Sequence, residues 1–169
     1  DTLATLALAA SLVEHGRIDA AAAAHSYGDF FRSASPFRGC PPSAAKVMQL
    51  VHEGVAVEKT GLPPHFPFAG GSFANGGAMR IAPLAVAYRK AGAASLRAAV
   101  EAAILSSHRH PEAIDFAVVQ AAAVQQMLLE HRSPEEVDVG ALLAELSTRC
   151  RTAAMRSVIV ATASALASA

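Results

Sequence analysis

The chain has 169 residues, of which 53% are hydrophobic, so it has the length of one ordinary domain and enough apolar side chains for a single core. Its 14 basic and 14 acidic side chains give a net charge of zero, which excludes the long-range field that attracts nucleic acid or an anionic membrane, and we expect neither as a partner. Two cysteines cannot form a disulfide framework, and the longest apolar stretch, 157–169, is too short and too rich in Ser, Thr and Ala to span a bilayer, so we expect an intracellular protein, in the cytoplasm, nucleus or an organelle.

The first third of the chain predicts three helices. Apolar residues recur at three- and four-residue steps over 1–15, and Gly16 follows as a stop. The other two helices are expected over 20–31, which Pro36 keeps from continuing far, and 44–52. Each follows a side chain that can cap a helix N-terminus, namely Asp1 or Thr2, Asp19 and Ser43.

The middle of the chain predicts a loop and two further helices. Residues 55–68 contain three prolines and no period, which indicates an extended surface loop. A helix is expected over 78–90, with Pro83 in its first turn or at a kink. Ser95 is expected to cap the next helix, which ends near Ser107.

The last third is also helical by its pattern. Residues 112–130 are long and apolar, and 133–136, Ser-Pro-Glu-Glu, form a helix-start signature. Helix is expected from about Val139 to the end, with a possible break near Cys150. No alternating pattern persists long enough to require a strand, so the sequence predicts an all-α fold around a core of small residues.

The most informative stretch is 70–83, which reads Gly-Gly-Ser-Phe-Ala-Asn-Gly-Gly-Ala-Met-Arg-Ile-Ala-Pro. Glycine lets a backbone approach a ligand closely, and the start of a helix offers unpaired N–H groups and partial positive charge. Such a loop suits a phosphate or another anion. The alternative is a tight turn into a buried helix, since glycine-rich turns are common.

A second stretch, Ser107 to Ala113, reads Ser-His-Arg-His-Pro-Glu-Ala. Together with 72–83 it resembles the two signatures of the ADP-ribosylglycohydrolase family, in the family's order. A third match is Asp1-Thr2, which is similar to the end of the family's Thr-Asp-Asp-Thr metal motif. The resemblance covers about residues 1–130.

The resemblance implies an orthogonal multi-helix all-α fold and a hydrolase that cleaves the bond at C1″ of ADP-ribose. The wording of 72–80 is closer to the branch that acts on ADP-ribosylserine, poly(ADP-ribose) or O-acetyl-ADP-ribose. The alternative in the same family is the branch that acts on ADP-ribosylarginine, including dinitrogenase reductase. The expected partners are ADP-ribosylated proteins or small molecules that contain ADP-ribose, and we expect a monomer.

The resemblance also implies site residues. The diphosphate and proximal ribose would lie against a loop with His108 beside it, and the substrate-binding set is Gly70, Gly71, Ser72, Phe73, Ala74, Asn75, Gly76 and His108. Asp1 would bind one of two Mg²⁺ ions, and Phe66 or Phe68 could stack on adenine. Taken alone, Asp1 is a helix cap, Asn75 can cap the next helix, and Phe73 is a core side chain. Arg80 is expected in a structural salt bridge.

Two parts of the family's machinery have no counterpart in 1–169. The acidic residue lies upstream of the metal motif, so no catalytic residue is assigned, and the second motif, Gly-Gly-Asp-Thr-Asp-Thr, is absent. We therefore interpret 1–169 as the central part of one domain, incomplete at both ends and by itself inactive. The alternatives are a non-catalytic crystallin-like helical module and a generic helical interaction domain. The His108-x-His110 pair suggests zinc only weakly, because further ligands at zinc spacing are missing.

Overall fold

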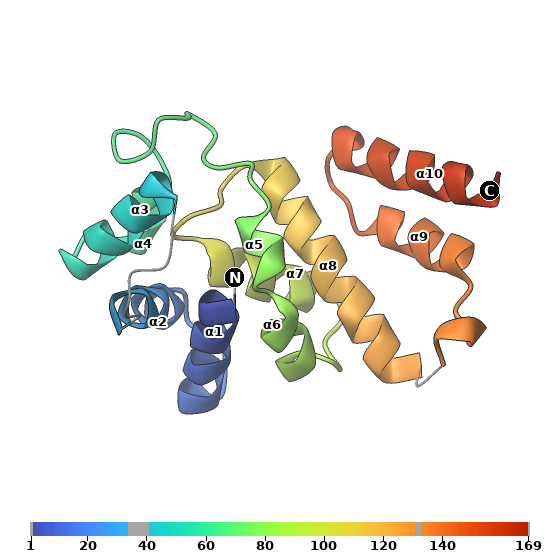
Figure 1. Cartoon of the computed structure of the whole chain (residues 1–169), viewed down its shortest axis with the longest axis horizontal. Helices are drawn as coiled ribbons and strands as arrows, with labels where there is room; N and C mark the ends of the chain where they lie inside the picture. Colours follow the sequence, from blue (N-terminus) through green and yellow to red (C-terminus); the bar gives the residue numbers. More distant parts are fainter. Residues whose placement is uncertain (1, 34–40, 131–132, 169) are drawn as a thin grey trace.

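The computed structural model describes residues 2–33, 41–130 and 133–168. Over these ranges the chain forms ten α-helices and one 3-10 helix, with no strand, which confirms the all-α prediction (Figure 1). The predictions that involve Asp1, Pro36 and Cys40 fall outside the described residues.

The chain opens with two packed helices, α1 (Thr2–His15) and α2 (Ala20–Ser33). Asp19 Oδ1 accepts a hydrogen bond from the Ala22 N–H at 2.9 Å, so the predicted cap is formed. Gly16 has a φ of 66°, a left-handed conformation that a glycine adopts without strain and that ends α1.

Helices α3 and α4 follow, and here the sequence prediction needs correction. Helix α3 (Pro42–His52) begins after Pro41 without a side-chain cap, so Ser43 is not its N-cap. The region expected as a loop contains a one-turn helix, α4 (Val57–Thr60).

The single helix expected over 78–90 is two helices, α5 (Gly76–Met79) and α6 (Ala82–Ala87). Pro83 occupies the first turn of α6, where a backbone N–H would have no partner within the helix, so its absence costs nothing. The same proline cannot donate a hydrogen bond to the Met79 carbonyl, and α5 therefore cannot continue through it. The chain therefore bends at Arg80, directly after the glycine-rich loop.

The centre of the molecule is built from α7 (Ala93–Ile104) and the long α8 (Pro111–Glu130). Helix α7 starts after Gly92, which has extended backbone and no side chain to cap, so Ser95 is not the N-cap either. Figure 1 shows α8 crossing the molecule beside α5, α6 and α7, all of which pack against it.

The chain closes with a 3-10 helix, η1 (Pro134–Glu136), and a hairpin of α9 (Val139–Thr148) and α10 (Ala153–Ala167). Residues expected to start a helix at Ser133 make only that single 3-10 turn, with the Ser133 N–H donating to Glu136 Oε2 at 2.9 Å. The predicted break near Cys150 is confirmed, because α9 ends at Thr148 and α10 begins at Ala153.

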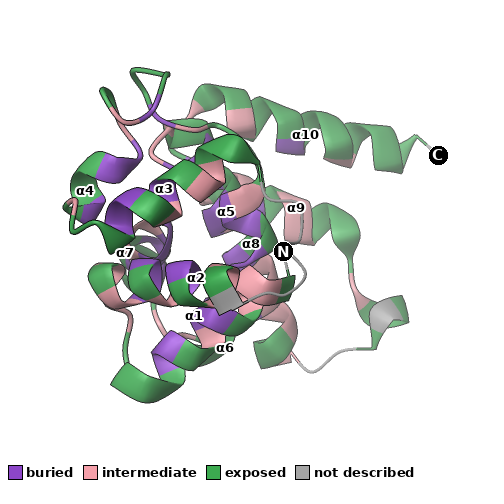
Figure 2. Ribbon diagram, turned by 60° about the vertical axis from the view of Figure 1, so that its left-hand side comes forward, coloured by how far each residue is buried: buried purple, intermediate pink, exposed green. Residues whose placement is uncertain are grey.

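The core is lined mainly by small side chains, as the composition predicts. Alanines from α1, α2, α7 and α8 are fully or almost fully buried, including Ala7, Ala23, Ala103, Ala117 and Ala121. The largest fully buried side chains of the core are Leu8, Ile81, Leu84, Leu96 and Ile104. Figure 2 shows the buried residues concentrated where α1, α2, α5, α7 and α8 meet, whereas α10 is almost entirely exposed. Among the described residues no helix is both long and apolar enough to cross a membrane.

Candidate functional site

The glycine-rich loop and the second signature stretch lie against each other, although more than thirty residues separate them in sequence. The His110 N–H donates to the Ser72 carbonyl at 3.4 Å. The rings of Phe73 and His110 meet edge to face, with centroids 5.8 Å apart. The two stretches that carry the family resemblance therefore form one surface.

Glycines make this contact possible. A Cβ added to Gly71, whose φ is 79°, would lie 2.5 Å from Arg109 Cβ and 3.1 Å from Arg109 Cα. A Cβ on Gly76 would lie 3.2 Å from both Cε1 and Nε2 of His108, and one on Gly70 would lie 3.2 Å from His110 Cδ2. The loop thus needs residues without side chains to pack against 108–110.

The segment that carries His108 is supported from below by α4. Thr60 Oγ1 donates to the Ser106 carbonyl at 2.7 Å, and Arg109 Nη1 donates to the Glu58 carbonyl at 3.2 Å. Thr60 is completely buried. The one-turn helix that the sequence did not predict therefore holds the 106–109 segment against the loop.

The predicted substrate-binding residues differ in how accessible they are. Phe73, Ala74 and Asn75 are exposed, whereas Gly71 and His108 are buried. Asn75 precedes α5, but its side chain makes no cap hydrogen bond, so its amide is not used in the helix cap. Helix α5 has only four residues, so the dipole expected at this position is small.

Aromatic side chains form a row along the edge of the loop. Phe66, Phe68 and Phe73 follow one another with centroid distances of 5.6 and 5.9 Å. Phe66 is only 7% exposed and anchors the loop, whereas Phe68 is 52% and Phe73 63% exposed. Of the two phenylalanines expected to stack on adenine, only Phe68 is exposed. Phe73, which taken alone would be core, is the most exposed of the three.

His108 is the buried titratable group of this surface. Its Nδ1 lies 2.9 Å from Ser107 Oγ, and its side chain is 8% exposed. Burial, together with the positive charge of Arg80, lowers the pKa of His108 to about 3. The imidazole is therefore neutral near pH 7 and can act on a ligand as a neutral hydrogen-bond donor or acceptor, not as a cation.

Arg80 lies beneath His108 and is not in the salt bridge that the sequence predicts. It is 9% exposed and belongs to none of the ion pairs among the described residues. Its Nη2 donates to Ser107 Oγ at 2.7 Å, its Nη1 donates to the Gly76 carbonyl at 3.2 Å, and its guanidinium carbon lies 4.4 Å from the ring centre of Tyr27. A hydroxyl, a carbonyl and an aromatic face take the place of a carboxylate.

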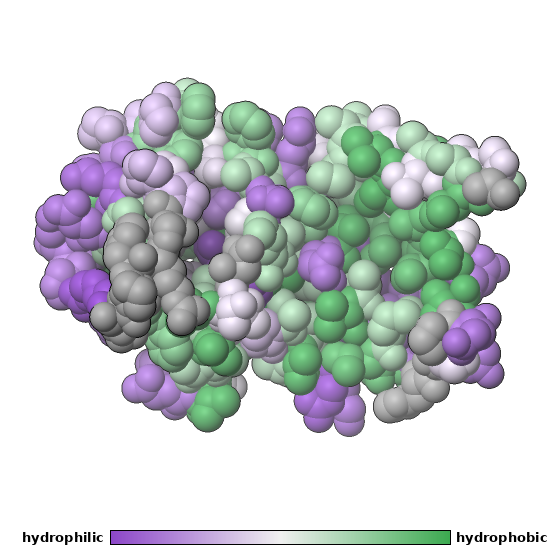
Figure 3. Space-filling model, viewed as in Figure 1, coloured by the Kyte–Doolittle hydropathy of each residue, from purple (hydrophilic) through white to green (hydrophobic). Residues whose placement is uncertain are grey.

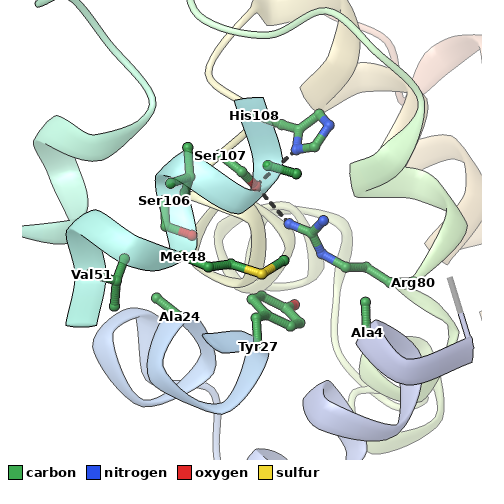
Figure 4. Close-up of a pocket in the computed structure, with 11 residues that line it drawn as sticks. Ala4, Ala24, Tyr27, Met48, Val51, Arg80, Ser106, Ser107 and His108 are labelled. Carbon is green, nitrogen blue, oxygen red and sulfur yellow. Dashed lines mark hydrogen bonds between the residues drawn. The ribbon is translucent and has the colours of Figure 1, made fainter. Parts of the chain in front are cut away.

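A small pocket opens beside these residues (Figure 4). Its walls are apolar side chains of α1 to α3 on one side, and Arg80, Ser106, Ser107 and His108 on the other. Its volume is about 50 Å³, which is room for a few water molecules but not for ADP-ribose. A ligand of that size therefore does not fit inside this pocket.

The described residues do not form a metal site on their own. No three His, Cys, Asp or Glu side chains within the described ranges come together, and Asp1, the predicted Mg²⁺ ligand, lies outside those ranges. His108 and His110 are both present, but Nδ1 of His108 is taken by Ser107 and the ring of His110 packs on Phe73. A zinc site at this pair is not formed by the described side chains.

Two residues of this site are not among the predicted site residues. Ser107 belongs to a signature stretch, and the Ser-His pair is a usable signal, because adjacent hydroxyl and imidazole groups can hydrogen-bond. Tyr27 lies on α2 and gave no signal, because nothing in its neighbourhood in the sequence points to a distant arginine.

Comparison with known protein families identifies the family of the chain. The sequence profile of the ADP-ribosylglycohydrolase family matches residues 1–169, the whole chain and not only the part that carries the signatures. No curated protein matches the chain.

Proposed function

Because the chain belongs to the ADP-ribosylglycohydrolase family, we propose that it is part of a glycosidase-type hydrolase that releases ADP-ribose from serine, from poly(ADP-ribose) or from O-acetyl-ADP-ribose. One observation supports a binding role for the described surface. The glycine-rich loop and His108 lie so close together that a Cβ added to Gly76 would be only 3.2 Å from the imidazole. An exposed row of aromatic side chains continues from that point.

Each group on this surface suits one part of ADP-ribose. Backbone N–H groups of the loop and the imidazole of His108 can donate hydrogen bonds to the diphosphate oxygens. Phe68 and Phe73 offer exposed rings against which a base or ribose can stack. Arg80 is buried beneath His108, so its full charge is not presented to a ligand. The diphosphate would instead be attracted by the partial charges of nearby N–H groups, which agrees with the zero net charge of the chain.

The Mg²⁺ dependence that the family resemblance implies stays a prediction. The described residues contribute no complete ligand set, so no step of the reaction is derived through a metal here. The prediction is testable without structural knowledge of the site, because chelation of divalent cations should abolish hydrolysis if metals orient the ribose and the attacking water.

The experiment that tests the proposed activity uses the natural full-length protein, because the predicted acid and the second metal motif have no counterpart in 1–169. ADP-ribosylserine and ADP-ribosylarginine peptides are incubated with the protein, with and without Mg²⁺, and free ADP-ribose is measured. We expect release from the serine peptide that requires Mg²⁺. Release from the arginine peptide alone would assign the protein to the other branch, and metal-independent turnover would contradict the proposal.

A calorimetric titration of this chain with ADP-ribose separates the proposal from its non-enzymatic alternatives. We expect binding that is weakened by Phe73→Ala and unaffected by Val158→Ala, a change at an exposed apolar residue of α10. Binding without hydrolysis by the full-length protein would favour a crystallin-like module. No binding would favour a helical interaction domain. The monomeric state is checked in the same samples by light scattering.

A further inference from the structure

The neutral imidazole of His108 has two possible tautomers, and they differ in what they offer a ligand. With hydrogen on Nε2 the ring presents a donor toward Gly76, whereas with hydrogen on Nδ1 it presents a bare acceptor there. Diphosphate oxygens only accept hydrogen bonds, so only the first tautomer can bind them. Which tautomer is present is decided by the partner of the other nitrogen.

That partner is Ser107, and its hydroxyl has three neighbours. Arg80 Nη2 donates to Ser107 Oγ at 2.7 Å. His108 Nδ1 lies 2.9 Å from the same oxygen, and the Ile104 carbonyl lies 3.4 Å from it. The Arg80 side chain only donates hydrogen bonds and cannot accept one, so the single hydroxyl hydrogen of Ser107 must be donated to His108 or to the Ile104 carbonyl.

The distances favour His108. A hydroxyl hydrogen bond has its optimum near 2.7 to 2.8 Å and is weak at 3.4 Å, so about 2.9 Å to Nδ1 is the better geometry. A cationic donor on the oxygen also polarises the hydroxyl and strengthens it as a donor in turn. If Ser107 donates to Nδ1, then Nδ1 carries no hydrogen.

The other edge of the ring is unpartnered and not completely buried. His108 Nε2 has no hydrogen-bond partner among the described residues, and it is not one of their fully buried unpartnered atoms, which are Ser11 Oγ and Arg80 Nε. A Cβ on Gly76 would lie 3.2 Å from Nε2, so this edge faces the glycine-rich loop. Figure 4 shows Ser107 between the guanidinium of Arg80 and the imidazole, with a dashed line to each.

We propose that Arg80 and Ser107 are positioning residues for His108, which together fix its imidazole as the tautomer with hydrogen on Nε2 and direct that N–H to the glycine-rich loop. Hydrogen bonds run in one direction through the chain, from Arg80 to Ser107 and from Ser107 to His108. The use of the final N–H, to hold a diphosphate oxygen of ADP-ribose, rests on the proposed function. The direction of the chain does not.

The test reads the tautomer directly. The chain is labelled with ¹⁵N, and long-range ¹H–¹⁵N correlations of the imidazoles are recorded near pH 7, where unperturbed histidines are largely neutral (pKa about 6.5). The His108 signals are identified by their loss in His108→Gln. We expect hydrogen on Nε2 and a bare Nδ1 in the wild-type chain. Hydrogen on Nδ1, or a doubly protonated ring, would overturn the proposal without the need for any further variant.

Variants then assign the cause. Ser107→Ala removes the donor, and we expect the His108 signals to move toward a mixture of tautomers, whereas Ser107→Thr keeps a hydroxyl and should restore the wild-type pattern. The matched control is Ser106→Ala, a change at a buried serine that lines the same pocket but makes none of these three contacts. An unchanged tautomer in Ser107→Ala, with the fold verified by circular dichroism, would refute the role of Ser107.

Ligand titration separates this inference from the proposed function. In Ser107→Ala we expect ADP-ribose to bind about three- to tenfold more weakly, the effect of one hydrogen bond, with Ser106→Ala unchanged. If the wild-type chain has hydrogen on Nε2 but ADP-ribose neither binds nor shifts that signal, the proposed function fails and the positioning of His108 stands. If ADP-ribose binds while His108 carries its hydrogen on Nδ1, the positioning of His108 fails and the proposed function stands.

Discussion

Gly71 is the residue at which backbone conformation and packing together exclude any side chain. Its φ of 79° lies in the left-handed region, and an added Cβ would be 2.5 Å from Arg109 Cβ and close to the Arg109 backbone. Gly54 has a similar φ of 84°, but no atom lies within 4 Å of the position of its Cβ. The two glycines therefore separate the cost of conformation from the cost of contact.

We predict that Gly71→Ala lowers the free energy of unfolding much more than Gly54→Ala. The left-handed conformation costs both variants about 1 to 2 kcal/mol. The contact with Arg109 adds about 1 to 3 kcal/mol in Gly71→Ala only, because backbone has to move. Urea denaturation of both variants measures the difference. Equal losses would show that the loop can leave the 108–110 segment at little cost.

His108 makes stability depend on pH in a defined window. Its pKa falls from the ordinary value of 6.5 to about 3 in the folded chain, so between these values the unfolded chain binds a proton that the folded chain does not. The folded state is therefore favoured fully above pH 6.5 and progressively less as the pH falls toward about 3.

We predict that His108→Gln flattens this dependence, because glutamine has no proton to bind in either state. The free energy of unfolding of the wild-type chain and of the variant is measured by urea denaturation at several pH values. The difference between them should shift in favour of the variant as the pH falls below 6.5. His25→Gln, a change at an exposed position of α2, controls for the loss of an imidazole. Parallel curves for the wild-type chain and His108→Gln would contradict a buried, neutral His108.

At the scale of elements, one buried carboxylate joins the α9–α10 hairpin to the rest of the chain. Asp115 on α8 is fully buried and accepts hydrogen bonds from Arg97 at 2.6 Å and from the backbone N–H groups of Arg151 and Thr152 at 2.9 and 2.7 Å. Burial alone raises the pKa of Asp115, but the hydrogen bonds, first that of the Thr152 N–H, outweigh it and hold the pKa below its ordinary 3.8.

We predict that Asp115→Ala costs about 3 to 5 kcal/mol, because it leaves the buried guanidinium of Arg97 with only the more distant Glu101 carboxylate, at 3.6 Å, and frees the start of α10. The matched control is Asp138→Ala, which removes the exposed cap of α9 and should cost about 1 kcal/mol. Both are measured by urea denaturation. Because the pKa of Asp115 is lowered, its contribution is present above pH 3.8 and is lost only as the pH falls through the lower, folded value. Equal costs for the two variants would refute a central role for Asp115.

Elements that depend on local patterns were predictable, and those that depend on distant contacts were not. The cap at Asp19 shows the first kind, since an Asp before an apolar run satisfies N–H groups wherever the helix later packs, although the same rule predicts caps at Ser43 and Ser95 that are not formed. The partners of Arg80 show the second, because its guanidinium contacts Ser107 and Tyr27, which lie far from it in the sequence. No pattern within the helix encodes those partners.

The candidate site also has features that the sequence predicts and features that it does not. Its two stretches could be identified from their residue sequences, and their proximity follows from the fold. The neutral state of His108 and the partners of Arg80 depend on burial by α1 to α3, which supply the far wall of the pocket. A salt bridge was the reasonable expectation for Arg80 from sequence, but the residues that approach it are a serine, a tyrosine and a glycine carbonyl.

At the scale of the whole molecule, buried contacts are distributed unevenly. Helices α7 and α8 supply much of the main core, whereas Ile159 is the only described residue of α10 that is buried. Figure 3 shows apolar side chains on the face formed by α8, α9 and α10, and Val158, Val160 and Leu166 of α10 are more than half exposed. Local stability follows buried contact, so we expect α10 to open far more easily than α8.

Hydrogen exchange followed by mass spectrometry can test both the difference in local stability between α8 and α10 and the proposed binding site. Amides of α10 should exchange fastest among the long helices and those of α8 slowest, because opening free energies follow burial. Saturating ADP-ribose, at about 100 times its Kd, stabilises the folded state globally by about 2.7 kcal/mol. Amides that exchange only by global unfolding, in α7 and α8, should therefore slow.

Local protection should be confined to the binding surface. We predict slower exchange at 70–76 and 106–110 in the presence of ADP-ribose, and unchanged exchange in α10, which opens without disturbing that surface. Ribose 5-phosphate, which lacks the adenosine, is the control and should protect less because it cannot reach the aromatic row. Protection in α10 equal to that at 70–76 would mean that the ligand binds elsewhere, or that the hairpin and the loop open as one unit.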